Sequence, residues 1–259
     1  MGKLVAIVML LIAAPAAAQQ SINVAFGSDA PSPSYAAAGA AGTWNSISGI
    51  AGMSFKLVAV DGSASGVSVS QSPTTTLITG SADPSVSGDD AKLLDHGLVT
   101  TGAETCLSFV GFRPGTYEVL VYAWSPNQPT VKSRTRQDEA PTTIDVGGAW
   151  TGSHAEGVTY ARYVVTVDSS GVLPAHSGLA PMQPSAALNG IQIRPLAATA
   201  ADAGIGGDAG GGGGGGAGET ADAGTGETTP HRAGCATSDE RAGWLVVGLV
   251  LVSLRRRRR

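Results

Sequence analysis

The alternation of apolar and polar residues between positions 22 and 196 most constrains what this chain can fold into. TCLSFVGF (105–112) and TYEVLVYAW (116–124) carry an apolar residue at nearly every second position, the period of a strand with one buried face. Similar segments lie at 22–27, 54–60, 66–70, 142–148, 159–171 and 188–196. Gly, Pro, Asn and Ser separate them, and no stretch has the apolar spacing of an amphipathic helix. We therefore predict an all-β fold, a single antiparallel β-sandwich.

The segment RPGT (113–116) joins two of these predicted strands. Pro114 fixes its own φ and Gly115 tolerates a positive φ, so a type II turn that closes a hairpin is expected here. The highly charged stretch 131–141 should then be a long solvated loop after the hairpin. Leu107 and Phe109 are expected to share one face of the first strand, and Tyr117, Val119 and Val121 one face of the second.

Both ends of the chain differ from this body. A basic start, an apolar run and a small-residue site at 16–18 predict a signal peptide over 1–18, cleaved between Ala18 and Gln19. The β-sandwich domain then covers 19–196. From 197 to 233 the sequence is rich in Gly, Ala and Asp, with seven consecutive glycines at 210–216 and no aromatic residue. Such a segment cannot bury enough apolar surface to fold, so a flexible, disordered linker is expected.

The remaining segment, 234–259, contains an apolar run from Trp244 to Leu254 followed by a block of arginines. Eleven helical residues span about 17 Å, against about 30 Å for the hydrocarbon core of a bilayer. A short C-terminal transmembrane helix that acts as a transient sorting element therefore fits better than a permanent anchor. The basic block, which would stay on the cytoplasmic side, consists of Arg255, Arg256, Arg257, Arg258 and Arg259.

Charge and cysteine content limit the function further. Residues 21–196 hold thirteen Asp and Glu against eight Lys and Arg, which argues against a nucleic-acid partner. The two cysteines, Cys106 and Cys235, stand in different surroundings, one in an apolar strand and one in the polar tail. Export would permit a disulfide between them, but the long glycine tract leaves nothing to fix their approach. We therefore expect them to remain unpaired.

Two resemblances add to this interpretation. INVAFG (22–27), GTWN (42–45), DGSASGVSVS (61–70), LLDHGL (93–98), GFRPGTYEVLVYA (111–123) and LNGIQI (188–193), in this order, resemble bacterial secreted proteins that carry a galactose-binding-like jelly-roll domain. The end of the chain is similar to the MYXO-CTERM sorting signal, through Gly234 and Cys235, the short hydrophobic segment and the arginine cluster. That resemblance implies export machinery and a tail-processing membrane protease as partners. It also implies a protein left at the cell envelope or cell surface, at the outer membrane.

The sequence has no recognisable catalytic constellation. His96, His154, His176 and His231 do not have metal-ligand spacing, and neighbouring residues such as Asp95 and His96 point to opposite faces of a strand. The sequence also lacks a nucleophile elbow, a phosphate-binding loop and a dinucleotide fingerprint. We therefore predict a protein that is not an enzyme and uses neither a metal nor a cofactor.

Tryptophans near loops provide the candidate binding residues. Trp44, Trp124 and Trp150, with Asn127 nearby in sequence, have the flat rings and amide groups that recognise sugars, although core packing would also explain the tryptophans. The first hypothesis is a non-catalytic binding protein displayed on the cell surface, with polysaccharide of the surface or matrix as its ligand. The alternatives are a structural or adhesive protein that contacts other proteins and, less favoured, a carboxylate-dependent hydrolase.

Overall fold

The computed structural model describes residues 20–48, 54–71, 76–78, 81–102, 104–138, 140 and 142–196. The signal peptide, the linker and the sorting tail predicted from the sequence lie outside these residues. In the described part of the chain, no helix is long and apolar enough to cross a membrane.

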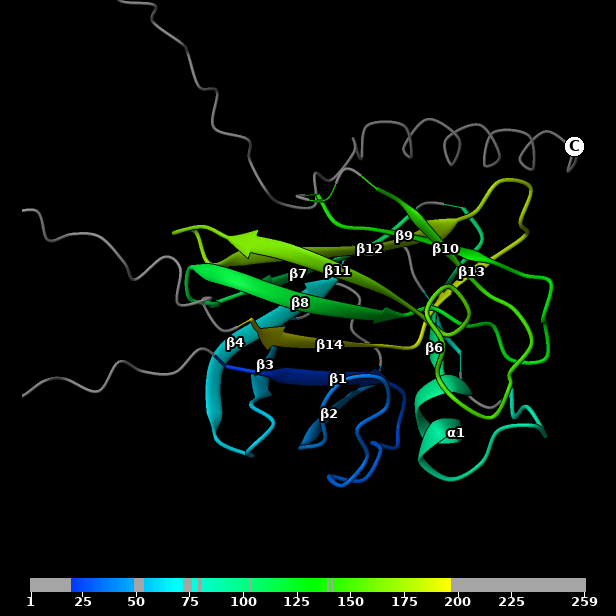
Figure 1. Cartoon of the computed structure of the whole chain (residues 1–259), viewed down its shortest axis with the longest axis horizontal. Coiled ribbons are helices and arrows are strands. Elements are labelled where there is room, and N and C mark those ends of the chain that lie inside the picture. The colour runs from blue at the N-terminus through cyan, green and yellow to red at the C-terminus, as the bar shows by residue number, and fades with distance from the viewer. Residues whose placement is uncertain are drawn as a thin grey trace, which may run out of the picture.

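Two β-sheets pack face to face (Figure 1), which confirms the predicted β-sandwich. The five-stranded sheet has the order β11 (Tyr160–Val167), β8 (Gly115–Tyr122), β14 (Gly190–Pro195), β1 (Ile22–Phe26) and β2 (Trp44–Ile47). The six-stranded sheet has the order β10 (Ile144–Val146), β9 (Ser133–Arg136), β12 (Val172–Leu179), β7 (Thr105–Val110), β4 (Ala64–Gln71) and β3 (Ser54–Val58). A small third sheet consists of β13 (Ala186–Leu188), β6 (Gly97–Thr100) and β5 (Thr76–Ile78).

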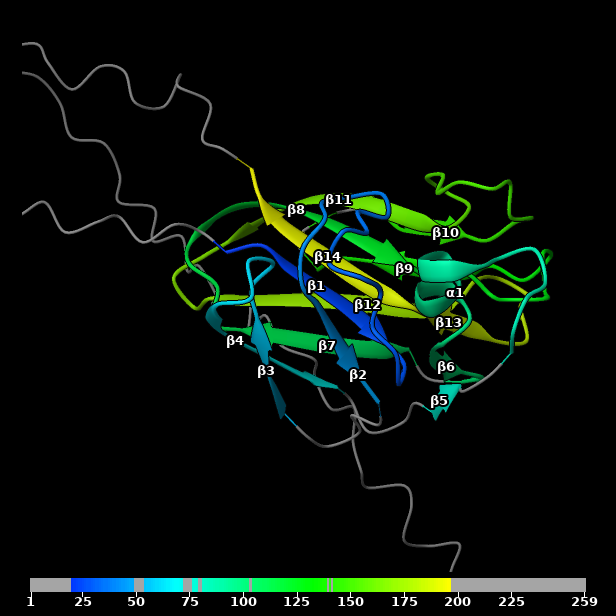
Figure 2. The ribbon, with the colours of Figure 1, turned by 90° about the horizontal axis from the view of Figure 1, so that it is seen from below.

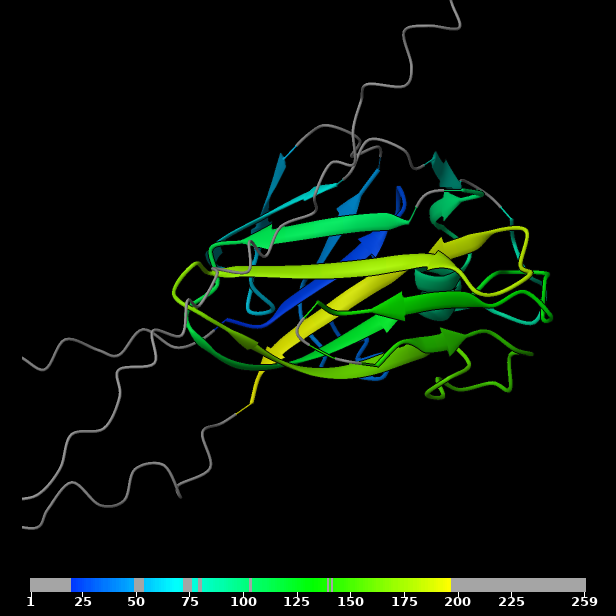
Figure 3. The ribbon, with the colours of Figure 1, turned by 90° about the horizontal axis from the view of Figure 1, so that it is seen from above.

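Neighbouring strands are antiparallel throughout, except that β1 and β2 run parallel. Figure 2 shows the sandwich from the side of β1 and β14, and Figure 3 shows it from the side of β7 and β12. The sandwich therefore has two outer faces, one on each sheet.

The core between the two sheets follows the alternation in the sequence. The five residues predicted to share a face of their strands are all completely buried in one apolar cluster, which confirms the shared faces and shows that they face the core; they are Leu107, Phe109, Tyr117, Val119 and Val121. The intervening residues of β8, such as Leu120 and Tyr122, belong to a different cluster on the other side of the sheet. Residues of one strand therefore serve both faces of the five-stranded sheet.

The predicted hairpin at 113–116 is wrong. β7 pairs with β4 and β12 in the six-stranded sheet, whereas β8 pairs with β11 and β14 in the five-stranded sheet. The segment between them carries the chain across the end of the sandwich. Gly111 allows this crossing because its φ is 108° and a Cβ there would lie 2.5 Å from the carbonyl oxygen of Gly66. Alternation shows which residues face the core, but it does not show from which sheet they reach it.

The predicted solvated loop at 131–141 is also corrected, because β9 lies within it. Ser133 and Thr135 are completely buried. The Ser133 hydroxyl accepts a hydrogen bond from the Ala187 backbone N–H at 2.8 Å, and the Thr135 hydroxyl bonds that of Tyr163 at 2.8 Å. The intervening Arg134 faces outward and pairs with Asp145. Because the buried residues of this strand are polar, its alternation could not be recognised as apolar against polar.

The described part of the chain contains one helix, α1 (Gly88–Leu94), although no stretch of residues 22–196 shows the apolar spacing of an amphipathic helix. Its last two residues, Leu93 and Leu94, are fully buried and pack in the same cluster as Ala25 of β1. Seven residues make about two turns, which is too short for a 3.6-residue apolar period to be seen in the sequence.

Candidate functional site: an aromatic cluster on the five-stranded sheet

A second apolar cluster covers the outer face of the five-stranded sheet near the end of β8. It lies under α1 and two connecting segments, 27–43 and 147–159, on the side of β1 and β14 shown in Figure 2. Its buried members are Ala25, Trp44, Val86, Leu93, Leu94, Leu120, Tyr122, Trp124 and Tyr160, and partly buried Tyr35 and Trp150 pack against them. The three tryptophans that the sequence singled out therefore meet in one place.

Two of these tryptophans are structural. Trp44 is 5 % exposed and Trp124 is 2 % exposed. The indole N–H of Trp44 donates to the Tyr35 carbonyl at 3.1 Å, and that of Trp124 donates to the Gly148 carbonyl at 2.8 Å. With their rings buried and their N–H groups bonded internally, these two side chains support the site from below.

Trp150 differs from them because its ring is only partly buried. The ring lies edge-on to His154, with 5.4 Å between the ring centroids, and is tilted against Trp124 at 6.5 Å. These two contacts hold the indole at the rim of the cluster. Among the three predicted tryptophans, Trp150 is the one whose ring a ligand can reach.

Asn127, the fourth predicted binding residue, holds a loop. It is exposed and adopts a φ of 58°, a conformation that asparagine tolerates well. Its side-chain amide donates to the Ala82 carbonyl at 3.1 Å, and its backbone N–H donates to the Asp83 carboxylate at 2.8 Å. These bonds fasten 125–128 to 81–83.

A hydrogen-bonded trio, Tyr35, Asp90 and His154, ties together the three segments that cover the cluster. The Tyr35 hydroxyl donates to Asp90 Oδ1 at 2.5 Å and lies 2.6 Å from His154 Nε2. His154 Nε2 is also 3.2 Å from Asp90 Oδ1. At the other edge of the ring, His154 Nδ1 lies 3.2 Å from the Thr159 hydroxyl.

Burial sets the protonation state of this trio. It raises the pKa of Tyr35, and the hydrogen bond to the Asp90 carboxylate raises it further. Burial lowers the pKa of His154, although the charge of Asp90 opposes this shift. We therefore assign a neutral histidine whose Nε2–H donates to the Tyr35 oxygen, which in turn donates to Asp90. All three groups have partners, and the trio is suited to fixing loops.

The trio could not have been found from the sequence. Tyr35 is separated from Asp90 by 55 residues and from His154 by 119 residues. None of the three stands in an alternating segment or a recognisable motif.

A separate charged cluster lies on the outer face of the six-stranded sheet. His176 of β12 stands opposite Cys106 of β7 and Arg136 of β9 in the strand register. His176 Nε2 is 3.0 Å from Asp138 Oδ1, and Arg136 forms two hydrogen bonds with Glu104, at 2.9 and 2.8 Å. Burial would raise the pKa of Glu104, but hydrogen bonds from His176 and Arg136 hold it at about 2.

Cys106 in this cluster is disulfide-bonded, and no free cysteine occurs in the described part of the chain. For Cys106 this corrects the expectation that the cysteines remain unpaired, because an apolar sequence context does not exclude a disulfide in a folded strand; Cys235 lies outside the described residues.

Within the described ranges, no group of three or more His, Cys, Asp or Glu side chains is placed to hold a metal ion. Asp95, the neighbour of His96, caps the end of α1, and its carboxylate accepts a hydrogen bond from the Asp83 N–H at 3.1 Å. Burial raises the pKa of Asp95.

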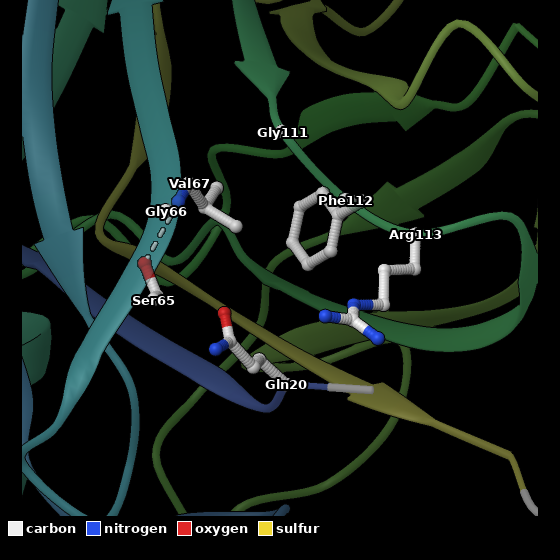
Figure 4. A pocket seen from close by; sticks show the side chains of 7 residues that line it. All are labelled: Gln20, Ser65, Gly66, Val67, Gly111, Phe112 and Arg113. Carbon is white, nitrogen blue, oxygen red and sulfur yellow. Dashed lines mark hydrogen bonds between the residues drawn. The ribbon is translucent and has the colours of Figure 1, made fainter. Parts of the chain in front are cut away.

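A polar pocket of about 240 Å³ lies at the opposite end of the sandwich, where β1 and β8 begin (Figure 4). In Figure 4 the side chain of Ser65 lies on the left, that of Gln20 below the centre, and those of Phe112 and Arg113 on the right. The pocket contains none of the residues that the sequence nominated for binding; its lining is Gln20, Ser65, Gly66, Val67, Gly111, Phe112 and Arg113.

Comparison with known proteins gives distant structural likenesses. No family description and no curated protein sequence matches the chain. Protein YXIM of Bacillus subtilis is similar with a TM-score of 0.39 and 13 % identity over 68 % of this chain, which spans 40 % of that protein. The CBM36-1 domain of a multidomain xylanase from the hindgut metagenome of Trinervitermes trinervoides has a TM-score of 0.29 and 14 % identity, over 51 % of this chain and 99 % of that domain. The C-terminal CBM6 of LamC from Zobellia galactanivorans has a TM-score of 0.22 and 18 % identity, over 38 % of this chain and 77 % of that domain. Likenesses at this level assign neither a ligand nor an activity to this chain.

Proposed function

We propose that this chain is an exported, non-catalytic protein of the cell surface that binds carbohydrate at the rim of the aromatic cluster, with Trp150 as the stacking residue. The observation that carries the proposal is the partly buried indole of Trp150, held between His154 and Trp124.

A fixed indole suits a sugar ligand for two reasons. Its flat apolar face packs against the C–H face of a pyranose, a contact that needs no charge and no metal. Because its neighbours already hold the ring, binding would cost less side-chain entropy than it would for a freely rotating tryptophan. The cluster beneath Trp150, although mostly buried, would thus contribute to binding by holding the indole ring in place.

Hydrogen-bonding groups for sugar hydroxyls stand nearby. Asp90 keeps a third of its side chain exposed and lies 3.2 Å from His154, which in turn contacts Trp150. A carboxylate oxygen accepts hydrogen bonds from hydroxyl groups, so Asp90 would orient a sugar that stacks on Trp150. Trp150 would then provide most of the affinity for the sugar, and Asp90 would provide selectivity among sugars.

The proposal of surface display is supported by the sequence of the two ends. The signal peptide at 1–18 would direct export, and the tail at 234–259 would be recognised by a membrane protease that leaves the protein at the envelope. The linker at 197–233 would then connect the domain with its attachment point.

Glycan-array binding by the exported full-length chain tests the proposal. Trp150→Ala should abolish binding, whereas Met182→Ala, a change at a completely exposed residue, should leave it intact. A wild-type protein that binds no glycan, or a Trp150→Ala variant that binds as well as the wild type, would refute the proposal. Capture of a defined surface protein without glycan binding would favour the adhesive alternative. Release of shortened products from oligosaccharides would show a hydrolase.

A further inference from the structure

We infer that the glycan bound by this domain is an acidic polysaccharide, whose carboxylate or sulfate groups pair with Arg162 and Arg194 on the outer face of the five-stranded sheet. The inference rests on the proposed function, because it specifies the class of glycan that meets Trp150. The observation that carries it is a pair of arginines around one buried carboxylate, that of Glu118, beside the aromatic cluster.

The three charged side chains lie on the same face of the sheet as the aromatic cluster. The residues that precede Glu118, Arg162 and Arg194 in the chain belong to the core between the sheets, so these three point outward. Glu118 of β8 stands opposite Arg194 of β14, and Arg162 belongs to β11 on the other side of β8. In Figure 2 α1 lies toward the right and β14 ends toward the left, with Arg194 as its last residue but one. The arginine pair therefore extends the site away from α1.

Two arginines that share one carboxylate leave positive charge at this place. Arg162 and Arg194 each bond to one oxygen of Glu118, whose side chain is only 7 % exposed, whereas their own side chains are 40 % and 31 % exposed. One carboxylate cannot neutralise two guanidinium groups. A second carboxylate, that of Glu156, is 3.5 Å from Nε of Arg162, but it is half exposed, so water screens this pair.

Arg194 can bind a further anionic group. Its Nε donates to Glu118, whereas its two terminal nitrogens donate no hydrogen bond within the described residues. A guanidinium presents its N–H groups as a planar fork, which matches two oxygens of a carboxylate or of a similar oxyanion such as sulfate. Because residues 21–196 hold thirteen Asp and Glu against eight Lys and Arg, accessible positive charge here is an exception on an acidic domain, and it indicates an anionic ligand.

The arginine pair is continuous with the aromatic cluster. Cζ of Arg162 lies 6.0 Å from the ring centroid of Tyr160, a member of that cluster. Along the chain, six residues separate Glu118 from Trp124, which contacts Trp150; at about 3.3 Å per residue this is about 20 Å. A monosaccharide stacked on Trp150 would therefore not reach both arginines, whereas an oligosaccharide of several units would.

Calorimetry with matched acidic and neutral glycans tests the inference on the exported protein. The probes are hexagalacturonate with its neutral methyl ester, and dextran sulfate with dextran. In one pair the acidic member should bind at least about tenfold more tightly than the neutral one, and added salt should reduce this difference. The pair that shows the preference identifies carboxylate or sulfate as the group that is bound.

Variants of the charged residues locate the effect. Arg194→Gln and Arg162→Gln should each weaken binding of the acidic glycan about tenfold and leave binding of the neutral glycan unchanged. The matched control is Arg134→Gln, which removes the same charge from the other sheet, where Arg134 pairs with Asp145, and should change neither. Glu118→Gln should tighten binding of the acidic glycan, because it releases both guanidinium groups. The preference of the wild-type protein and its salt dependence stand even where a variant fails to fold.

Three results would overturn the inference. These are wild-type binding of acidic glycans no tighter than that of neutral ones, an acidic preference that Arg194→Gln and Arg162→Gln leave unchanged, and equally tight binding of polyglutamate, which would show a patch for any acidic polymer. Stacking on Trp150 is tested separately, by Trp150→Ala with the neutral glycan. An arginine-dependent preference that survives Trp150→Ala would refute the stacking and leave the recognition of acidic glycans standing.

Discussion

Replacing Tyr35 with phenylalanine removes only the hydroxyl group at the centre of the Tyr35–Asp90–His154 trio. That hydroxyl donates to Asp90 at 2.5 Å and faces His154 Nε2 at 2.6 Å. A hydrogen bond to a charged group contributes about 1.5 to 3 kcal/mol to stability. His154 can turn its N–H to Asp90, which is already 3.2 Å away, so the histidine need not be left without a partner. We therefore expect Tyr35→Phe to lower the free energy of unfolding by about 2 kcal/mol.

Urea unfolding followed by tryptophan fluorescence measures this change, because all three tryptophans of the domain lie in the cluster. Tyr160→Phe is the matched control in the same cluster: its hydroxyl lies 3.5 Å from the Arg162 guanidinium, at the limit of a hydrogen bond, and should cost less than about 0.5 kcal/mol. The double variant with His154→Gln should be less destabilised than the sum of the two single variants. Additive effects, or a Tyr35→Phe change as small as the control, would show that the trio does not act as a unit.

Three further predictions concern the same region. Because burial lowers the pKa of His154, the stability that this residue contributes is complete above its unfolded-state pKa of about 6.5 and is lost as pH falls through its folded-state pKa. The slope of the unfolding free energy against pH in this range should therefore flatten in His154→Gln, and an unchanged slope would contradict a buried, neutral His154. Gly190→Ala should lower the melting temperature sharply in calorimetry, because the added Cβ would lie 2.5 Å from the Val24 carbonyl oxygen, and a variant with the wild-type melting temperature would contradict this packing. Trp124→Ala should cost about 3 to 5 kcal/mol of unfolding free energy, whereas Trp150→Ala should cost clearly less because its ring is partly exposed; equal losses in urea unfolding would place both rings in the core.

Alternation in the sequence predicts strands well where the buried residues are apolar. It located β1, β7, β8 and β11, and it identified the residues of β7 and β8 that face the core. It failed where the buried face of a strand is polar, as with Ser133 and Thr135 in β9. It also failed for β12, which contains Pro174, a residue that usually argues against a strand.

The structure shows why a proline is tolerated in β12. In the described register, β7 pairs with β12 from Val172 to Ser177, but β9 pairs with it only from His176 onward. At Pro174 one side of β12 is therefore not paired with β9, so a missing N–H on that side breaks no ladder bond. Whether a proline is tolerated depends on which strands pair with that part of β12, and the local sequence does not show this pairing.

The candidate site was only partly predictable because the exposure of a side chain depends on its place in the fold and not on its residue type. The sequence nominated Trp44, Trp124 and Trp150 by residue type, and the three rings do share a cluster. Trp124 follows β8 on the face that also carries Leu120 and Tyr122, and such an apolar outer face must be covered if it is not to meet water. The covering segments bury Trp44 and Trp124, while Trp150 lies at their rim. A ligand therefore meets the residue at the edge of the cover, and which residue lies there depends on contacts, such as that of Tyr35 with His154, between parts of the chain more than a hundred residues apart.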